Sequence, residues 1–359
     1  MRFPRCRHNS LLLLLLQCAC AQGVFAQQVQ VSVFALFHPG RVRLTPTRGQ
    51  ALIVTSSKNA RIVLNGEAGR DHLLFENRND TLQADEQTAL SWSATARDGG
   101  PAEFQLEIPG KLTRIYRGQL SLRAEAGVIL LQVGMERETA VASIVAAEMR
   151  TDAPLEALKA QAIVTRSFLA TSGHHAGFDF CDTTHCQFLK SPPAADSPVW
   201  RAVEATRGLV LNYRGKTLAA LYSSRCGGRT RTLRESGLAA ANAPSDAYPY
   251  FAVDCLWCHK HPLLWRRTAN TAPPDAGNER ARIQWNRQKG WNALPGSNYT
   301  LAANGSGWQV EGHNTGHGLG LCQIGAIGMA ESGAEFHQIL AFYYPNTVVL
   351  PLEPRHNEG

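Results

Sequence analysis

The sequence lacks a long apolar run anywhere after its first thirty residues. No later stretch approaches the roughly 18 consecutive apolar residues that a membrane-spanning helix needs. It also lacks low-complexity tracts and any recognisable motif for binding DNA or RNA. These absences predict a globular chain without a transmembrane segment, and they argue against nucleic acid as a partner.

A strong excess of one charge is missing as well. The chain has 36 Lys and Arg against 29 Asp and Glu, a formal net charge of +7. Three of the basic residues are Arg2, Arg5 and Arg7, so the remainder carries 33 basic residues against the same 29 acidic ones, a net charge of +4. This mild excess suits an anionic cell envelope and is too small to indicate nucleic-acid binding.

Residues 1–26 have the pattern of a secretory signal peptide. The three arginines precede an apolar segment, Leu11–Leu16, and Val24-Phe25-Ala26 provides a cleavage signal. We therefore expect export to the periplasm or the cell envelope. Lipidation of Cys18 or Cys20 is the alternative, but Gln17 occupies a position where a lipoprotein signal has a small or apolar residue.

Two regions with different sequence patterns follow the signal peptide. Residues 27–116 contain short β-rich runs such as ALIVTSS and EFQLEI, separated by Pro, Gly, Asn and Asp turns, and they predict a β-rich scaffold. Residues 117–350 are expected to form the functional domain. There, apolar residues three and four apart predict a helix around 138–150 and a second one from Asp152 to Gly173. A loop-rich insertion is expected at about 229–305, with 270–305 its most mobile part.

Six cysteines remain after residue 26: Cys181, Cys186, Cys226, Cys255, Cys258 and Cys322. An even number in an exported chain permits disulfides, and we expect Cys226 to pair with Cys255 or Cys258. CLWCH at Cys255–His259 also matches the pattern of c-type haem attachment, but nothing else in the sequence indicates a haem.

The glycine-rich segment GHGLGLCQIG is not a dinucleotide-binding fingerprint, because Gln323 stands at the third glycine position. No organic cofactor is expected.

Five segments resemble the stage II sporulation protein D family (SpoIID/LytB, the amidase-enhancer domain). In chain order they are EMRTDAPLEALKAQAIVTRSF, DFCDTTHCQ, AVEATRGLVLNY, CGGRT and GHGLGLCQIGAIGMAESG. The resemblance covers roughly residues 117–345. It implies an α+β fold, in which a mixed or antiparallel sheet and helices line a cleft after a β-rich N-terminal region. Studied members of this family are lytic transglycosylases that cut peptidoglycan glycan strands, preferring strands stripped of their peptides. Others were described as enhancers of a cell-wall amidase.

The resemblance implies that Glu148, in AAEMR, is the catalytic acid. Breaking a glycosidic bond needs a proton on the leaving oxygen. A lytic transglycosylase can use a single acid, because the 6-hydroxyl of N-acetylmuramic acid (MurNAc) attacks intramolecularly and leaves a 1,6-anhydro end. Apolar neighbours such as Val145 and Met149 are expected to raise the pKa of this carboxyl into the range useful for proton donation. The alternative is an ordinary solvated helix residue.

The same resemblance gives candidate substrate-binding residues. Lys159 and Arg166 match basic positions of the family motif and would bind sugar hydroxyls or the lactyl carboxylate; the alternative is that both are solvent-facing helix charges. Ser224, His317 and Gln323 would line the cleft, where glycines let the backbone approach a sugar.

His175, Cys181, His185 and Cys186 match the zinc-binding variant of the family, with His174 as the alternative to His175. Two thiolates and two imidazoles form a closed tetrahedral site, so the expected zinc is structural and does not activate water. A disulfide between Cys181 and Cys186 remains the alternative, because a four-residue spacer can close. Either arrangement would fix one wall of the cleft.

The leading hypothesis is therefore an exported lytic transglycosylase in which Glu148 acts first as acid and then as base. The second is a non-catalytic protein that binds peptidoglycan and enhances a cell-wall amidase, and the departure from the family at Cys322, where serine is common, favours it. A third, a zinc-dependent hydrolase, would need an open metal position and a nearby second base, which the spacing does not supply.

Overall fold

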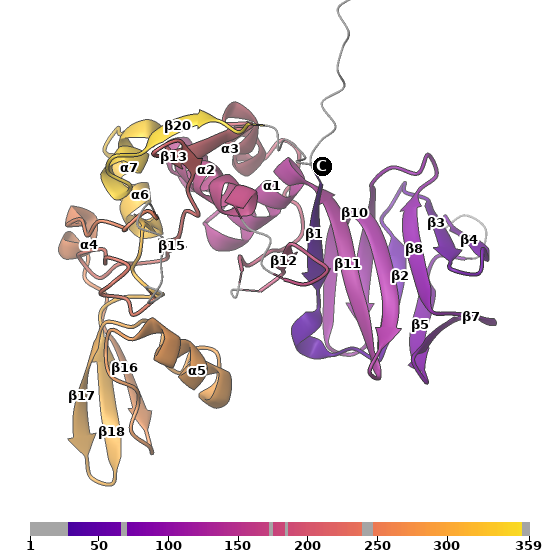
Figure 1. Cartoon of the computed structure of the whole chain (residues 1–359), viewed down its shortest axis with the longest axis horizontal. Helices are drawn as coiled ribbons and strands as arrows, with labels where there is room; N and C mark the ends of the chain where they lie inside the picture. The colour runs from indigo at the N-terminus through magenta and orange to yellow at the C-terminus, as the bar shows by residue number, and fades with distance from the viewer. Residues whose placement is uncertain (1–27, 66–69, 172–174, 184–185, 239–246, 354–359) are drawn as a thin grey trace, which may run out of the picture.

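The computed structural model describes residues 28–65, 70–171, 175–183, 186–238 and 247–353. A curled β-sheet, a group of helices and a small second sheet follow one another along the chain (Figure 1). The fold is α+β, as predicted.

The large sheet has 12 strands in the order β12-β1-β11-β10-β9-β2-β5-β6-β7, with β3, β4 and β8 joined to it through β10. Its pairings are antiparallel except for the short parallel pair of β1 with β12. The strands are β1 (Gln28–Val33), β2 (Arg41–Pro46), β3 (Leu52–Ser56), β4 (Arg61–Leu64), β5 (Leu73–Arg78), β6 (Thr81–Ala84), β7 (Gln87–Ala89), β8 (Ser91–Ala96), β9 (Ala102–Ile108), β10 (Leu112–Glu125), β11 (Val128–Glu136) and β12 (Phe180–Cys181).

Alternation of apolar and polar residues explains this sheet. In β9, for example, every second residue from Ala102 to Ile108 is buried, which is the period of two expected for a half-buried strand. The expected domain boundary at residues 116 and 117 falls inside β10, whose first half pairs with β9 and second half with β11. The β-rich region and the helical region therefore share one continuous strand.

The two predicted helices are present as α1 (Arg137–Glu148) and α2 (Leu155–Thr171). They are followed by further short elements: α3 (Pro198–Ala205), β13 (Leu209–Tyr213), β14 (Lys216–Thr217), β15 (Tyr222–Ser223), β19 (Leu321–Cys322), α6 (Gln323–Glu331), α7 (Phe336–Tyr343) and β20 (Val348–Pro351). β13 pairs with β14 and β20, and β15 pairs in parallel with β19. The last pairing joins segments about 100 residues apart in the sequence.

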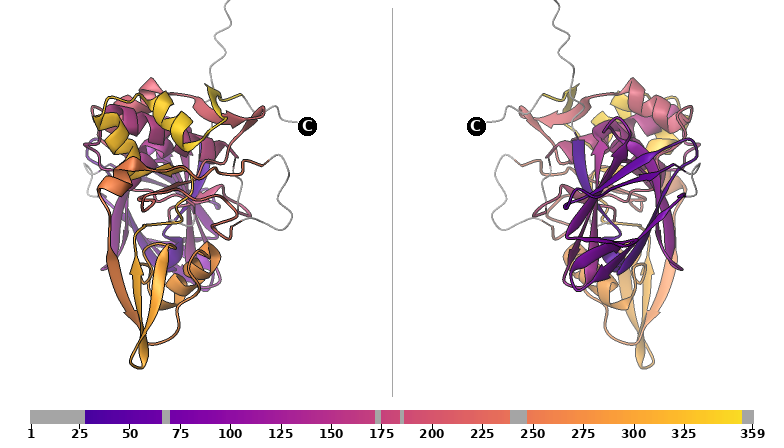
Figure 2. Two further views of the ribbon diagram at one scale, coloured as in Figure 1. Left: turned by 90° about the vertical axis from the view of Figure 1, so that its left-hand side faces the viewer. Right: turned by 90° about the vertical axis from the view of Figure 1, so that its right-hand side faces the viewer.

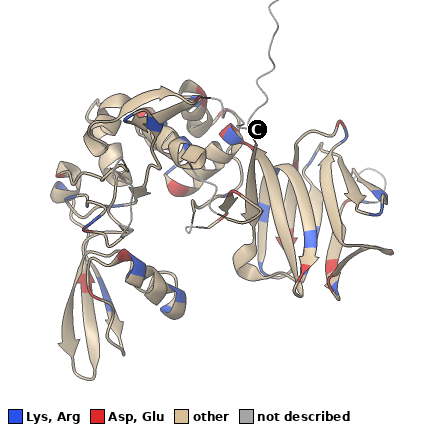
Figure 3. Cartoon of the chain, viewed as in Figure 1, with Lys and Arg blue, Asp and Glu red and all other residues tan. Residues whose placement is uncertain are grey.

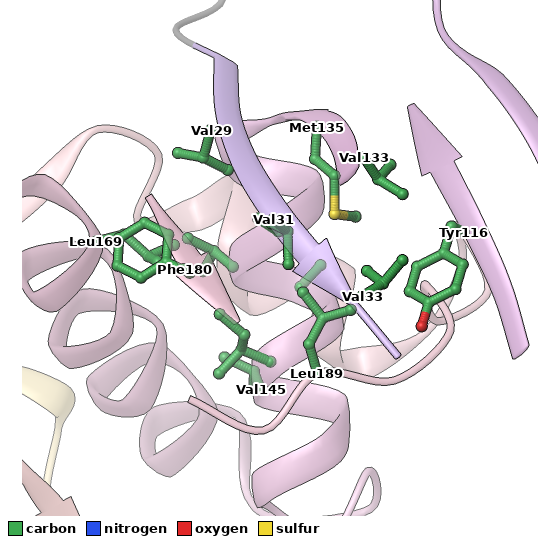
Figure 4. Close-up of a cluster of buried hydrophobic side chains, with 14 of the residues drawn as sticks. Val29, Val31, Val33, Tyr116, Val133, Met135, Val145, Leu169, Phe180 and Leu189 are labelled. Carbon is green, nitrogen blue, oxygen red and sulfur yellow. The ribbon is translucent and has the colours of Figure 1, made fainter. Parts of the chain in front are cut away.

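Strand β1 connects the sheet to the helices. Figure 4 shows Val31 of β1 between Phe180 and Val145 on the helical side and Val133 on the sheet side. These side chains are buried and belong to one hydrophobic core that includes residues of both regions. The sheet thus supports α1 and α2 directly.

The expected loop-rich insertion at about 229–305 contains four regular elements: α4 (Leu256–Lys260), β16 (Trp265–Ala269), α5 (Glu279–Lys289) and β17 (Tyr299–Asn304). The next strand, β18 (Gly307–Gly312), pairs with β16 and β17 to form a separate sheet. Trp265, Leu294, Tyr299 and Val310 form a small core of their own. The two turned views in Figure 2 show this unit extending below the helices. The sequence did not predict this core, because its apolar residues are far apart in the chain and only the fold brings them together.

Lys, Arg, Asp and Glu are interspersed along the ribbon (Figure 3). Within the part of the chain that the structure describes, none of the helices has the length and apolarity required to cross a membrane.

Candidate active site

Glu148 is the last residue of α1, and its side chain is half-buried. One carboxylate oxygen accepts a 2.9 Å hydrogen bond from the backbone N–H of Phe188. The phenol of Tyr222, on β15, donates a second hydrogen bond to the carboxylate. Phe188, 40 residues from Glu148 in the sequence, and Tyr222, which is farther still, thus both donate to this carboxylate.

Burial raises the pKa of Glu148, and this is the largest influence on it. The hydrogen bonds from Phe188 and Tyr222 and the charge of Lys190 act in the opposite direction, yet the pKa remains raised. The C-terminal end of a helix also disfavours a negative charge, because the helix dipole is negative there. The predicted rise in pKa is therefore confirmed, although the groups around the carboxyl come from distant segments as well as from its sequence neighbours.

Tyr222 is held by the parallel pair of β15 with β19, in which it lies opposite Leu321. The His317 ring interacts with the Tyr222 backbone, and the His317 Nδ1 accepts a hydrogen bond from the Leu319 N–H at 3.0 Å. Burial lowers the pKa of His317 to about 4, so the imidazole is neutral at physiological pH. Since Nδ1 is an acceptor, the proton is on Nε2. His317 thus positions Tyr222.

Phe188 follows the cysteine loop that the sequence analysis singled out. The Cys186 Sγ lies 3.1 Å from the His175 Nε2 and 3.5 Å from the Cys181 Sγ, and the ligand atoms of these three residues lie within 4.8 Å of one another. His185 and the alternative His174 lie outside the described residues. The two sulfur atoms are farther apart than the roughly 2.05 Å of an S–S bond, and the three residues could hold a metal ion.

Two aspartates attach this loop to the large sheet. Asp179 accepts a 2.8 Å hydrogen bond from the Gln30 N–H. Asp182 is buried and accepts hydrogen bonds from the Arg114 guanidinium at 2.7 Å and the Tyr116 hydroxyl at 3.2 Å. Because the loop is fixed on the sheet, the Phe188 N–H has a defined position next to Glu148.

Gln323 is the next predicted residue that the fold brings into this region. It is buried at the start of α6, and its side-chain amide donates to the Gln161 Oε1 of α2 at 3.3 Å. Ser224 is exposed, and its backbone carbonyl accepts a hydrogen bond from the Ile324 N–H. Ser224 and Gln323 thus lie on the two segments that β15 and β19 join, next to Tyr222.

Lys159 lies at a different contact. Its Nζ is 2.6 Å from the Glu156 Oε1 and lies over the Phe336 ring, and Glu156 accepts a hydrogen bond from the Phe336 N–H. Lys159 therefore supports the packing of α2 against the start of α7.

Arg166 requires a correction. Its side chain is fully buried, and the guanidinium forms an ion pair with the buried Glu138 at 2.6 Å and donates to the carbonyls of Leu209 and Val203. It is neither a solvent-facing charge nor available to a sugar. Arg166 is a structural residue that connects α2 to α1, α3 and β13.

The sequence analysis missed Tyr222, Phe188 and Lys190. A backbone N–H carries no residue-type signal, and LYSS offers nothing that distinguishes this tyrosine from a core tyrosine. A surface hollow lined by Thr45, Arg48 and Asp98 lies on the large sheet and contains none of the predicted site residues.

The structure is thus an α+β protein in which the partly buried Glu148 carboxyl lies between the cysteine loop and the β15–β19 pair.

Residues 128–213, from β11 to β13, match the family described as Stage II sporulation protein, SpoIID. A stage II sporulation protein D of Bacillus amyloliquefaciens is 26% identical over 254 residues, which cover 58% of this chain and 72% of that protein. An uncharacterized protein of Brachyspira hyodysenteriae is 26% identical over 266 residues, 64% of this chain and 70% of the relative. Residues 128–213 therefore carry a SpoIID domain, as the sequence segments predicted.

Proposed function

We propose that this protein is an exported lytic transglycosylase that cleaves the bond between MurNAc and N-acetylglucosamine in peptidoglycan glycan strands. Strands stripped of their peptides would be the preferred substrate. The observation that carries the proposal is the Glu148 carboxyl, which is half-buried, has a raised pKa and is held from two sides by Phe188 and Tyr222. A carboxyl in this state can hold a proton at a pH where an exposed glutamate would lose it.

The chemistry needs only this one acid. Protonated Glu148 gives its proton to the glycosidic oxygen as the bond from the MurNAc anomeric carbon to that oxygen breaks. The resulting carboxylate then takes the proton of the MurNAc 6-hydroxyl while that oxygen bonds to the anomeric carbon. The products are a new sugar hydroxyl and a 1,6-anhydro ring, no water is consumed, and Glu148 regains its proton.

The neighbours of Glu148 support both halves of this cycle. Burial favours the protonated acid, whereas the Phe188 N–H, the Tyr222 hydroxyl and the Lys190 charge stabilise the carboxylate that forms after proton transfer. The charge that acts on Glu148 is a lysine rather than a second acid, which suits a reaction whose nucleophile belongs to the substrate.

A structural zinc ion in the cysteine loop is part of this proposal. His175, Cys181 and Cys186 offer one nitrogen and two sulfur ligands within 4.8 Å of one another, a donor set that zinc prefers. His185 would be the fourth ligand by the sequence pattern. The ion would fix the loop that carries the Phe188 N–H, and a closed four-ligand site leaves no position for substrate.

The test is incubation of the purified protein with peptide-stripped and with intact peptidoglycan, followed by mass spectrometry of the soluble products. Fragments with 1,6-anhydro-MurNAc ends are expected. Reducing ends would indicate a hydrolase instead. If neither substrate gives fragments but a cell-wall amidase becomes faster in the presence of the protein, the enhancer function is correct.

A further inference from the structure

A second cysteine cluster lies outside the site described above. Its four members are Cys226, Cys255, Cys258 and Cys322. The sequence analysis expected a disulfide between Cys226 and Cys255 or Cys258 and did not group the four together. Each is at most 2% exposed, and the four Sγ atoms all lie within 4.8 Å of one another. No S–S bond joins them; the Cys258 and Cys322 sulfurs, for example, are 3.5 Å apart.

We propose that these four cysteines bind a structural zinc ion. With Zn–S bonds of about 2.3 Å, the sulfurs of a tetrahedral site lie about 3.8 Å apart, which agrees with the spacing of this cluster. An iron–sulfur cluster would hold its thiolates farther apart, because several irons and sulfides lie between them. A haem attached to Cys255 and Cys258 would need open space beside two sulfurs that are buried against Cys226 and Cys322.

The cluster is assembled from three separate segments. Cys226 follows β15 by three residues, Cys255 and Cys258 lie at and within the first turn of α4, and Cys322 ends β19 directly before α6. A C-x-x-C pair combined with two single cysteines is a common way of building a four-thiolate zinc site. Buried cysteines that only fill a core need no shared centre, whereas here all four sulfurs meet at one point.

Neighbouring groups are arranged to stabilise charged thiolates. The N–H groups of Cys226 and Gly325 each point to the Cys322 Sγ at 3.4 Å, and the Tyr343 hydroxyl lies 3.3 Å from the Cys255 Sγ. A Cβ atom at Gly325 would lie 2.6 Å from the Cys255 Sγ, so only glycine lets α6 approach the cluster this closely. Such outer hydrogen bonds are typical of metal-bound ligands.

The ion would hold one side of the active site. Cys322 pairs with Ser223 in the β15–β19 junction, one residue from Tyr222, and it precedes Gln323, which bonds to α2. Because four thiolates fill the coordination sphere, this zinc would position Tyr222 without taking part in the chemistry. Zinc at the cysteine loop would then fix the Phe188 N–H, and zinc at this cluster would fix Tyr222, the two hydrogen-bond donors of Glu148.

The test is the metal content and the zinc X-ray absorption spectrum of the full-length protein purified without added metal. The decisive variant is Cys181→Ser/Cys186→Ser, which removes the loop site and leaves the second cluster intact. We expect this variant to retain one equivalent of zinc per chain with four sulfur ligands. Because the readout is independent of activity, it can succeed even if the proposed transglycosylase is wrong.

The matched variant Cys255→Ser/Cys258→Ser is expected to lose the all-sulfur zinc, and a misfolded product would not affect the first measurement. Three results would overturn the proposal. The first is a zinc-free Cys181→Ser/Cys186→Ser protein in which Cys226, Cys255, Cys258 and Cys322 form two disulfides, which lowers the mass by one hydrogen for each of the four. The second is a zinc-free protein in which these four thiols react only after denaturation. The third is bound iron in place of zinc.

Discussion

The Phe188 N–H and the Glu148 carboxylate, 2.9 Å apart, join the cysteine loop to the end of α1. Phe188 lies only two residues after Cys186, so we expect a change in the conformation of the loop to move a donor of the proposed catalytic acid. Tyr222 approaches the same carboxyl from the β15–β19 junction. The state of Glu148 therefore depends on two separate parts of the chain, and each can be tested on its own.

Replacing Tyr222 by Phe tests the junction. The Tyr222 hydrogen bond lowers the pKa of Glu148, so its loss should raise that pKa further. The acid would stay protonated to a higher pH, and the alkaline limb of the pH–rate profile should move upward. The rate at neutral pH should fall roughly tenfold, since the carboxylate formed after proton transfer loses a donor. A pH–rate profile identical to that of the wild type would show that this hydrogen bond has no influence on the acid.

Replacing Glu148 by Gln should stabilise the fold at neutral pH. The raised pKa means that the folded state holds the proton more tightly than the unfolded chain, so stability is lost as the pH rises from the unfolded-state pKa to the folded-state pKa, and the full cost remains above it. Below the unfolded value both states are protonated and the cost disappears. We expect Glu148→Gln to gain roughly 0.5–2 kcal/mol at pH 7, a range common for single stabilising substitutions.

Thermal unfolding at pH 7 and pH 4 checks this expectation. The gain should be present at pH 7 and vanish toward pH 4. Glu331→Gln, at the exposed end of α6, is a matched control and should be neutral at both values. A stabilisation that is equal at the two pH values would contradict the assigned rise in the pKa of Glu148.

Arg166→Met tests the structural role of the Arg166–Glu138 pair. Removing one member of a buried ion pair leaves an uncompensated charge and typically costs about 3–5 kcal/mol. Denaturant unfolding should show this loss, while KM for glycan should not change in the protein that remains folded. Arg207→Met removes the corresponding member of an exposed pair with Glu204 and should cost less than about 1 kcal/mol. A raised KM with unchanged stability would restore the substrate-binding interpretation.

Chelation tests the proposed role of zinc in the loop. Since a closed site holds no substrate, activity should fall only as fast as the circular dichroism signal changes. Immediate loss of turnover with an unchanged fold would instead indicate a catalytic metal and support the zinc hydrolase.

The substitution Cys186→Ser should also lower the rate, because it would displace the Phe188 N–H. Asp196→Asn, an exposed change nearby in the sequence, is the control and should have no effect.

The helices α1 and α2 were predictable, because their apolar residues recur with helical spacing and local signals mark their ends. The acid itself depended on a family resemblance, since an isolated helical glutamate carries no distinguishing pattern. Arg166 was misjudged because its partner Glu138 is 28 residues away and no local signal reveals a buried pair. The four-cysteine cluster was equally hidden, because its members are separated by up to 96 residues and meet only when β15 pairs with β19.

The most direct test of the central claim is the rate at which wild type and Glu148→Gln release 1,6-anhydro-MurNAc fragments from peptide-stripped glycan, with Glu331→Gln as the control. Loss of a general acid is expected to lower that rate at least about 100-fold. The Glu148→Gln protein should at the same time unfold at the temperature of the wild type or above it. Anhydro products released at an unchanged rate by a folded Glu148→Gln protein would contradict the assignment of Glu148 as the acid.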